Sequence, residues 1–274
     1  MKKLFSLALL FIAAVSVNAG TPIKYNKGTA TILCSQGFQG PEQWDKEVFP
    51  VDKKGYITIF DGKTLRGWRS YGTHGVSPKW TVEDGCIRFN PQAKGAGGDI
   101  IFAHKFKNFE LTMQWKISKG GNSGIFYLAQ ETTNKDGNLE PIYISCPECQ
   151  VLDNENHPDA KLGVDGNRKA GSLYDMIPAK PQNARPYGEW NTITIRVYNG
   201  HVTHIQNGVQ VLSYDLWTPE WTELLQKSKF SEAKWPHAFE LLNNCGGDLH
   251  EGFIGMQDHG NDVWFRNIKV KELK

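Results

Sequence analysis

Alternation of apolar and polar residues is the most regular pattern along this chain. Between residues 109 and 117 every second residue is large and apolar, and the residues between them are polar or charged. A period of two is typical of a β-strand that buries one face and exposes the other. The pattern therefore predicts an antiparallel strand over 109–117, and shorter apolar runs predict further strands at 56–60 and 262–272.

A three-stranded meander is predicted between residues 191 and 215. Its alternating segments are separated by two Asn-Gly pairs, Asn199-Gly200 and Asn207-Gly208. Asn-Gly suits the type I′ turn, in which both central residues need positive φ. The segments on either side of each pair are therefore expected to fold back on each other as hairpins.

Only one segment, from Thr218 to Lys229, has a helical pattern. Thr218 can cap the helix, Pro219 suits its first position, and Trp221 and Leu224 share one face. Many short strands with one short helix predict an all-β fold, a single β-sandwich of the jelly-roll type.

The N-terminus has the three parts of a secretory signal peptide. A basic start is followed by an apolar run from Leu4 to Val17 and by small residues ending at Ala19. We expect cleavage near Ala19 and a periplasmic or secreted protein. The apolar run is too short to span a bilayer, and no later segment is apolar enough, so no membrane span is expected. Residues 20–52 have little periodicity and are interpreted as an arm laid over a domain at 53–274.

The charge balance argues against a polyanionic partner. The formal net charge is +2, and removing Lys2 and Lys3 with the signal peptide brings it to about zero. Proteins that bind nucleic acid or anionic membranes usually carry a clear basic excess. No nucleic-acid partner is therefore expected.

Five cysteines leave the disulfide pattern open. An oxidising compartment permits disulfides, but an odd count leaves at least one thiol over. Cys146 and Cys149 have the spacing of half a zinc site, and the second half is missing, so a structural zinc is disfavoured.

Polar side chains concentrate between residues 148 and 157. Glu148 and Gln150 are two apart, so on a strand they point to the same face, which we expect to be the concave one. Asp153 follows at the strand end and His157 in the loop. One interpretation is an ordinary loop with Asx-turns. The other is an acid/base or metal site at the rim of a sheet, with Asp153 and His157 as metal ligands.

Two more polar clusters could complete such a site. Gln257, Asp258 and His259 follow an apolar strand, where they either reach the site across the sheet or form only a hairpin loop. Asn122 and Ser123 lie in a glycine-rich turn, and both can donate hydrogen bonds to a sugar.

A series of motifs occurs in order from about Tyr56 to the C-terminus. They include Gly188-Glu189-Trp190-Asn191 and Glu148-x-Gln150-x-Leu152-Asp153-Asn154, and the others lie at 60–68, 80–85, 98–100, 109–111, 120–126, 157–159, 170–174, 255–260 and 265–268. Any single motif is weak, but the ordered set is specific. It resembles the 3-keto-disaccharide hydrolase domain family of secreted bacterial proteins. Cys146 and Cys149 depart from that pattern.

The resemblance implies a concanavalin-like jelly roll that cleaves glycosides already oxidised at C3, with an oligosaccharide or glycoside as substrate. A C3 ketone acidifies the C2–H bond, so one base can remove that proton. The group at C1 then leaves by elimination, and water adds back to give net hydrolysis. This route needs a base of near-neutral pKa and an acid for the leaving group. No organic cofactor is needed, and a divalent metal ion could polarise the ketone.

Within this scheme Glu148 or His157 is the candidate base, and Asp153 either binds a metal or orients the imidazole. The remaining candidates would contact the substrate: Gln150, Asn154, Asn122, Ser123, Gln257, Asp258 and His259. The alternative function is a non-catalytic, lectin-like carbohydrate-binding module. Such a module needs aromatic platforms and amides, but no converging acid and base groups.

Overall fold

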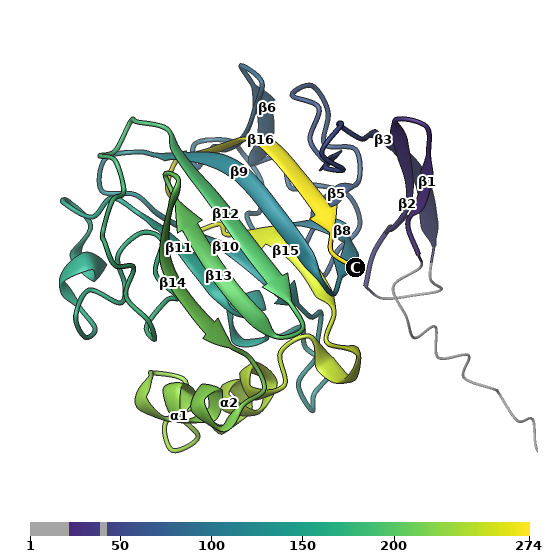
Figure 1. The fold of residues 1–274 in the computed structure, drawn as a ribbon. Coiled ribbons are helices and arrows are strands. Elements are labelled where there is room, and N and C mark those ends of the chain that lie inside the picture. The colour runs from purple at the N-terminus through teal and green to yellow at the C-terminus, as the bar shows by residue number, and fades with distance from the viewer. Residues whose placement is uncertain (1–21, 39–42) are drawn as a thin grey trace, which may run out of the picture.

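Two antiparallel β-sheets packed face to face make up most of the molecule (Figure 1). This computed structural model describes residues 22–38 and 43–274. The predicted signal peptide, 1–19, lies outside the described residues. The all-β jelly-roll sandwich predicted from the strand patterns is confirmed.

The larger sheet has the strand order β14-β13-β12-β9-β16-β7-β6, and β4 pairs with β16. Strand β9 covers Phe109–Ile117 and alternates between buried and half-buried residues along its whole length, as predicted. The predicted meander is also present. Asn199 and Asn207 both have a φ of 49°, and the glycines after them have φ of 84° and 81°. The other strands are β4 (Ile57–Thr58), β6 (Trp80–Glu83), β7 (Cys86–Phe89), β12 (Asn191–Tyr198), β13 (His201–Gln206), β14 (Val209–Asp215) and β16 (Val263–Glu272).

The smaller sheet has the order β11-β10-β15-β8-β5. Its strands are β5 (Trp68–Ser70), β8 (Ile100–Phe106), β10 (Asn122–Ala129), β11 (Glu148–Leu152) and β15 (Gly252–Met256). Every residue of β10, β11 and β15 is buried. These strands therefore have cover on both faces, one from the larger sheet and one from long loops.

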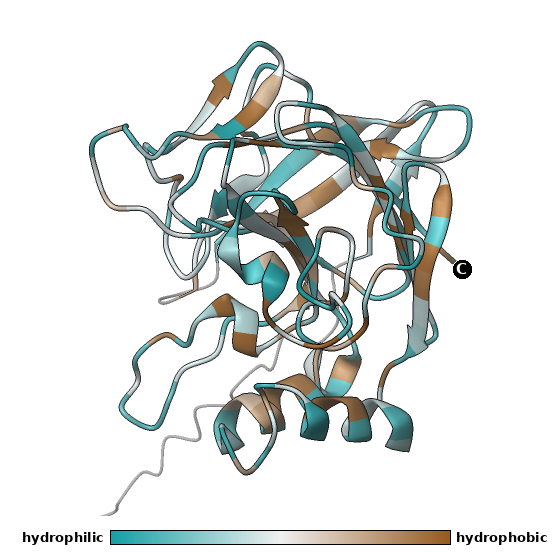
Figure 2. Cartoon of the chain, turned by 90° about the vertical axis from the view of Figure 1, so that its left-hand side faces the viewer, coloured by the Kyte–Doolittle hydropathy of each residue, from teal (hydrophilic) through white to brown (hydrophobic). Residues whose placement is uncertain are grey.

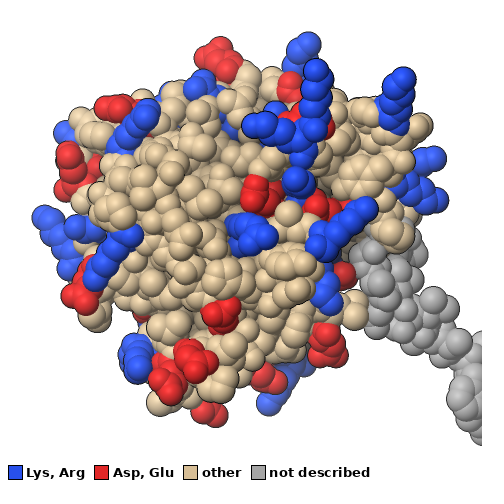
Figure 3. Space-filling model, viewed as in Figure 1, with Lys and Arg blue, Asp and Glu red and all other residues tan. Residues whose placement is uncertain are grey.

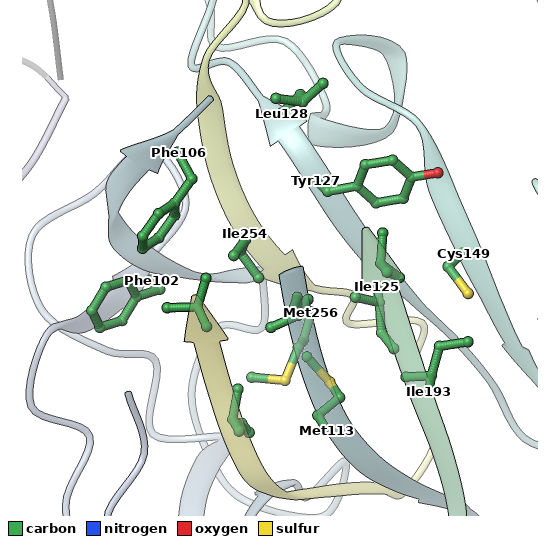
Figure 4. Packing of buried hydrophobic residues seen from close by; sticks show 14 of the residues in the cluster. Phe102, Phe106, Met113, Ile125, Tyr127, Leu128, Cys149, Ile193, Ile254 and Met256 are labelled. Atoms are coloured by element: carbon green, nitrogen blue, oxygen red, sulfur yellow. The ribbon is translucent and has the colours of Figure 1, made fainter. Parts of the chain in front are cut away.

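The main hydrophobic core lies between the two sheets (Figure 4). Ile125, Ile254 and Met256 of the smaller sheet pack there with Met113 and Ile193 of the larger one. A second, smaller cluster lies on the other face of the smaller sheet, and it contains Tyr71, Ile101, Phe126, Ala129, Ile142, Cys146 and Phe253. The outer face of the smaller sheet is thus a second packing surface.

The N-terminal segment interpreted as an irregular arm is in fact a small antiparallel sheet. It has three strands, β1 (Lys24–Asn26), β2 (Thr29–Ser35) and β3 (Trp44–Pro50). Strand β2 does alternate, since Ala30, Ile32 and Cys34 are buried while their neighbours are not. The pattern was missed because Thr, Ala and Cys give a weak hydrophobic contrast.

Two helices lie below the sandwich, in the connection between β14 and β15 (Figures 1 and 2). Helix α1 (Pro219–Lys227) begins as predicted, because the Thr218 side chain accepts a hydrogen bond from the Trp221 N–H. The prediction of a single helix is wrong, since α2 (Pro236–Asn243) follows. It is only eight residues long and has no side-chain cap, so its sequence signal is weak. The remaining helical pieces are the 3₁₀ turns η1 (Ile142–Ile144), η2 (Pro158–Lys161) and η3 (Gly247–Leu249).

All five cysteines are buried and carry free thiols. Acidic and basic side chains are interspersed on the face shown in Figure 3. Within the described ranges, no helix has both the length and the apolar character needed to cross a membrane.

Candidate active site

A cleft of about 390 Å³ lies on the outer face of the smaller sheet. It combines carboxyl groups, amides, one lysine, one imidazole and the rings of two tyrosines and one tryptophan. Its lining consists of Asp99, Asn122, Tyr143, Glu148, Gln150, Tyr174, Lys229, Trp235, Gln257, Asp258 and His259. A volume of this size is typical of sites for small ligands.

The register of the smaller sheet places the polar floor of the cleft. Gly124 pairs with Gln150, and the Gln257 N–H donates to the Gly124 carbonyl. Ile100 pairs with Met256, so Asp99 and Gln257, the residues next to them, lie side by side. Gln150, Gly124, Gln257 and Asp99 therefore form one row across the sheet. Because neighbours in such a row point to the same side of a sheet, one row across four strands supplies several of the polar groups.

Glu148 lies on β11 two residues before Gln150, and its side chain leans over the neighbouring strand β10. A methyl group built on Gly124 would lie 2.7 Å from the Glu148 Cδ and 2.8 Å from its Cγ. The missing side chain at Gly124 therefore makes room for the Glu148 carboxyl group. Glu148 is only 7% exposed, and no described residue donates a hydrogen bond to its carboxyl oxygens.

Long connections outside the sheet form the wall of the cleft. Tyr143 comes from the β10–β11 connection, and Tyr174 from the loop after β11. Lys229 and Trp235 come from the segment between α1 and α2. The Lys229 ammonium lies 4.4 Å from the centre of the Tyr174 ring, and the Trp235 and Tyr143 rings meet edge to face at 6.1 Å. The cleft thus depends on segments far apart in the sequence.

Ion pairs fix the loop that carries Tyr174. The Arg168 guanidinium lies 2.8 Å from Asp159 and 2.6 Å from Asp175. The Tyr174 hydroxyl donates to Asp159 at 3.0 Å, and the Lys229 N–H donates to Asp175 at 2.7 Å. The same loop therefore positions both the tyrosine ring and the backbone of the lysine.

Burial shifts the pKa values of the cleft groups towards neutrality. Burial raises the pKa of Glu148 to about 8, while the positive charge of Lys229 opposes the rise and the negative charges of Asp99 and Asp159 add to it. Burial also raises the pKa of Asp99 to about 7. Burial lowers the pKa of Lys229, and the charge of Glu148 partly restores it. The carboxyl groups of Glu148 and Asp99 can therefore both take up and release a proton near neutral pH.

Two amide oxygens of the cleft have no hydrogen-bond partner among the residues that the structure describes. Asn122 Oδ1 and Gln257 Oε1 are buried and accept no hydrogen bond in the described part of the chain. Buried polar atoms without partners are uncommon in native proteins and cost free energy. Hydroxyl groups of a bound ligand could satisfy both.

The cleft brings together six of the predicted residues, Glu148, Gln150, Asn122, Gln257, Asp258 and His259. Four other candidates do not line it, and local contacts explain their positions. Ser123 points away from Asn122 and donates to the Gln257 carbonyl, and the Asn154 side chain accepts from the Ala170 N–H. His157 caps η2, because its Nδ1 accepts from the Asp159 N–H at 3.1 Å.

Asp153 has a structural role at the end of β11. Its carboxylate accepts hydrogen bonds from the Gly120 and Glu155 N–H groups and from both the backbone and the side chain of Asn156. These donors hold the pKa of Asp153 below its usual range, against the effect of burial. This is the Asx-turn interpretation that the sequence left open.

The residues present do not fit the divalent metal site considered from the sequence. Residues 22–38 and 43–274 contain no group of three or more His, Cys, Asp and Glu residues that could hold a metal ion. Asp153 already accepts four hydrogen bonds, and one ring nitrogen of His157 is used by the helix cap. Metal dependence stays a prediction, which dialysis against a chelator tests.

Five lining residues were not among the sequence candidates, namely Asp99, Tyr143, Tyr174, Lys229 and Trp235. Asp99 and Tyr174 do occur in the ordered motifs, at 98–100 and 170–174, and that was the available signal. For Lys229 the sequence pattern indicates only the end of a helix. Tyr143 and Trp235 reach the cleft through long connections whose path the sequence does not reveal.

Comparison with known proteins places the chain in one family. The sequence profile of the family described as "3-keto-alpha-glucoside-1,2-lyase-like domain" matches residues 55–271. A Bacteroides thetaiotaomicron protein named 3-keto-disaccharide hydrolase is 69% identical over 240 residues, which are 84% of this chain and 83% of that protein.

Two solved structures from Parabacteroides distasonis, both provisionally described as glycosyl hydrolases, have the same fold. One is 30% identical, with a TM-score of 0.67 over 81% of this chain and 95% of that one. The other is 24% identical, with a TM-score of 0.56 over 80% of this chain and 99% of that one.

Proposed function

This chain belongs to the family of 3-keto-α-glucoside-1,2-lyase-like domains, and from that premise we propose that it is a hydrolase that cleaves glycosides carrying a ketone at C3. The observation that supports this most is the Glu148 carboxyl group. It is buried in the cleft, receives no hydrogen bond from any described residue, and has a pKa of about 8 beside Lys229. A base with a pKa near the working pH is what proton abstraction from carbon requires.

Glu148 removes the proton from C2 of the sugar. The electrons of the C2–H bond form an enolate with the neighbouring ketone. The enolate then expels the oxygen substituent at C1, which leaves a C1=C2 double bond conjugated with the C3 carbonyl. Addition of water, with hydroxide going to C1 and a proton to C2, gives the free 3-keto sugar and completes a net hydrolysis.

Lys229 stabilises the negative charge that develops on the ketone oxygen. It is the one lysine that lines the cleft in the described part of the chain, and its charge already interacts with Glu148. A positioned cation at a developing enolate lowers the barrier without reorganising solvent. Asn122 and Gln257 hold the ring by accepting hydrogen bonds from its hydroxyl groups.

The test compares a 3-keto-glucoside with its unoxidised parent. The wild-type protein is expected to turn over the keto substrate far faster, because only the ketone acidifies C2–H. Glu148→Gln should lower the rate by about 10²–10⁴-fold. Glu155→Gln is the matched control, since Glu155 is exposed and lies outside the cleft lining.

Three outcomes would contradict the proposal. Equal rates on both substrates would indicate an ordinary glycosidase. Binding of sugars with no turnover would favour the lectin-like alternative. Full activity of the Glu148→Gln variant would remove Glu148 from the mechanism.

A further inference from the structure

Asp99 lies across the cleft from Glu148. It directly precedes β8, whereas Glu148 begins β11, and β15 and β10 run between these strands. Neighbouring strands are about 4.8 Å apart, so the two backbones are separated by about 14 Å. The Glu148 side chain extends across one of these three spacings between strands, because it leans over Gly124 of the neighbouring strand β10. The gap that remains between the two carboxyl groups lies over Gln257 and is part of the cleft.

The hydrogen bonds of Asp99 leave one of its oxygens available. Asp99 Oδ1 accepts from the Asp258 N–H at 2.8 Å, and no described residue donates to Oδ2. The Asp258 carboxylate accepts from the Gly98 and Gly260 N–H groups at 2.7 and 2.9 Å. Burial is the main effect that disfavours a negative charge on Asp99, and Oδ2, the oxygen without a donor among the described residues, is free to carry a proton.

The two carboxyl groups also differ in their nearest charges. Lys229 acts on Glu148, whereas the charge that acts on Asp99 is the negative one of Asp258. The pKa of Glu148, about 8, lies above that of Asp99, about 7, so a single shared proton rests mainly on Glu148, and the form with a charged Glu148 and a protonated Asp99 is the minor one. This minor form has the charge states that a base and an acid need, and the positive charge of Lys229 stabilises its Glu148 carboxylate.

We propose that Asp99 is a second catalytic residue, the acid that protonates the departing oxygen at C1. This inference rests on the proposed function. When the C1–O bond breaks, its electron pair goes to the leaving oxygen, and that oxygen takes the proton from Asp99 Oδ2. The leaving group departs as a neutral alcohol, Asp99 becomes a carboxylate, and Glu148 holds the proton from C2.

The same two residues can then complete the cycle. The Asp99 carboxylate takes a proton from the water that attacks C1, and Glu148 returns its proton to C2. Both groups end in their starting charge states, so the enzyme turns over without another proton source.

The test uses the leaving-group dependence of the Asp99→Asn variant. A nitrophenolate leaves readily without a proton, whereas a sugar or methyl alkoxide needs one. Asp99→Asn should therefore lose about 10²–10⁴-fold in rate on a 3-keto-disaccharide or methyl 3-keto-glucoside, and less than about tenfold on nitrophenyl 3-keto-glucoside. The ratio of the two rates does not depend on how much of the variant is folded.

Each alternative result has a defined meaning. Equal losses on both substrates would overturn the proposal and leave Asp99 a structural role. A selective loss in Glu148→Gln, with equal losses in Asp99→Asn, would exchange the two roles and also overturn it. Failure of the wild-type protein to cleave any 3-keto-glycoside would instead refute the proposed function. Asp84→Asn, a change in an exposed turn outside the cleft, is the control for the substitution itself.

Discussion

The absence of a side chain at Gly124 is expected to decide where the Glu148 carboxyl group lies. A methyl group at this position would be 2.7 Å from the Glu148 Cδ, and ordinary contact begins at 3.4 Å. Gly124→Ala should therefore move the carboxyl group by about 0.7 Å or more. The φ of Gly124 is not in the left-handed region, so the backbone accepts alanine, and the change acts mainly on Glu148.

A misplacement of about 1 Å can cost about 10²-fold in rate. We expect Gly124→Ala to lower kcat on a 3-keto-glucoside by between tenfold and a hundredfold, with a smaller change in KM. The thermal melt should change little, since alanine favours the strand while the contact opposes it. Stopped-assay kinetics and a melt on the same preparation give both values.

The double variant Gly124→Ala/Glu148→Asp tests the cause. Aspartate is one carbon shorter and avoids the new methyl group, so the two changes should be less than additive in a double-mutant cycle. Full additivity, or unchanged kcat in Gly124→Ala, would refute the inference that Glu148 acts from above β10.

Two further predictions concern charge in the cleft. The pKa of Glu148 rises from a usual 4.5 to about 8 on folding, so the folded protein keeps a proton that the unfolded chain loses, and stability should fall as the pH rises through this window. At pH 9 the unfolding free energy of Glu148→Gln should therefore exceed that of wild type by up to about 4 kcal/mol. The difference should vanish near pH 4, and a difference that stays constant with pH would contradict this. Lys229→Met removes the charge that lowers the pKa of Glu148, so the rate on a 3-keto-glucoside should fall and its pH profile should shift to higher pH. An unshifted profile would show that Lys229 does not act on the base.

Local patterns in the sequence predicted the parts of the fold that depend on local chemistry. Strand β9 alternates because it has one half-exposed face, and the Asn-Gly pairs occupy the turns where positive φ is needed. Glu148 and Gln150 were correctly predicted to share a face, because the period of a strand is fixed. Helix α2 and strand β2 were missed, since a short uncapped helix and a strand of small residues give little contrast.

The composition of the cleft could be predicted only in part, because it depends on cross-strand register and on loop paths. Asp99 reaches the cleft because Ile100 pairs with Met256, and no local sequence pattern predicts that pairing. Lys229 and Trp235 arrive from the connection between β14 and β15. Asp153 and His157 are near Glu148 in sequence, but the structure places Asp153 in a turn and His157 at the cap of η2, and neither is part of the cleft lining.

The burial pattern of the smaller sheet explains why the site lies where it does. Long connections cover its outer face with the cluster around Phe126 and Ile142, which stabilises the fold. That apolar cover ends at the row of Asp99, Gln257 and Gln150, where polar side chains replace it. Carboxyl groups at such a boundary are desolvated enough for their pKa values to rise, yet they remain open to a ligand. The same burial that costs stability at Glu148 therefore supplies the near-neutral base on which the proposed chemistry depends.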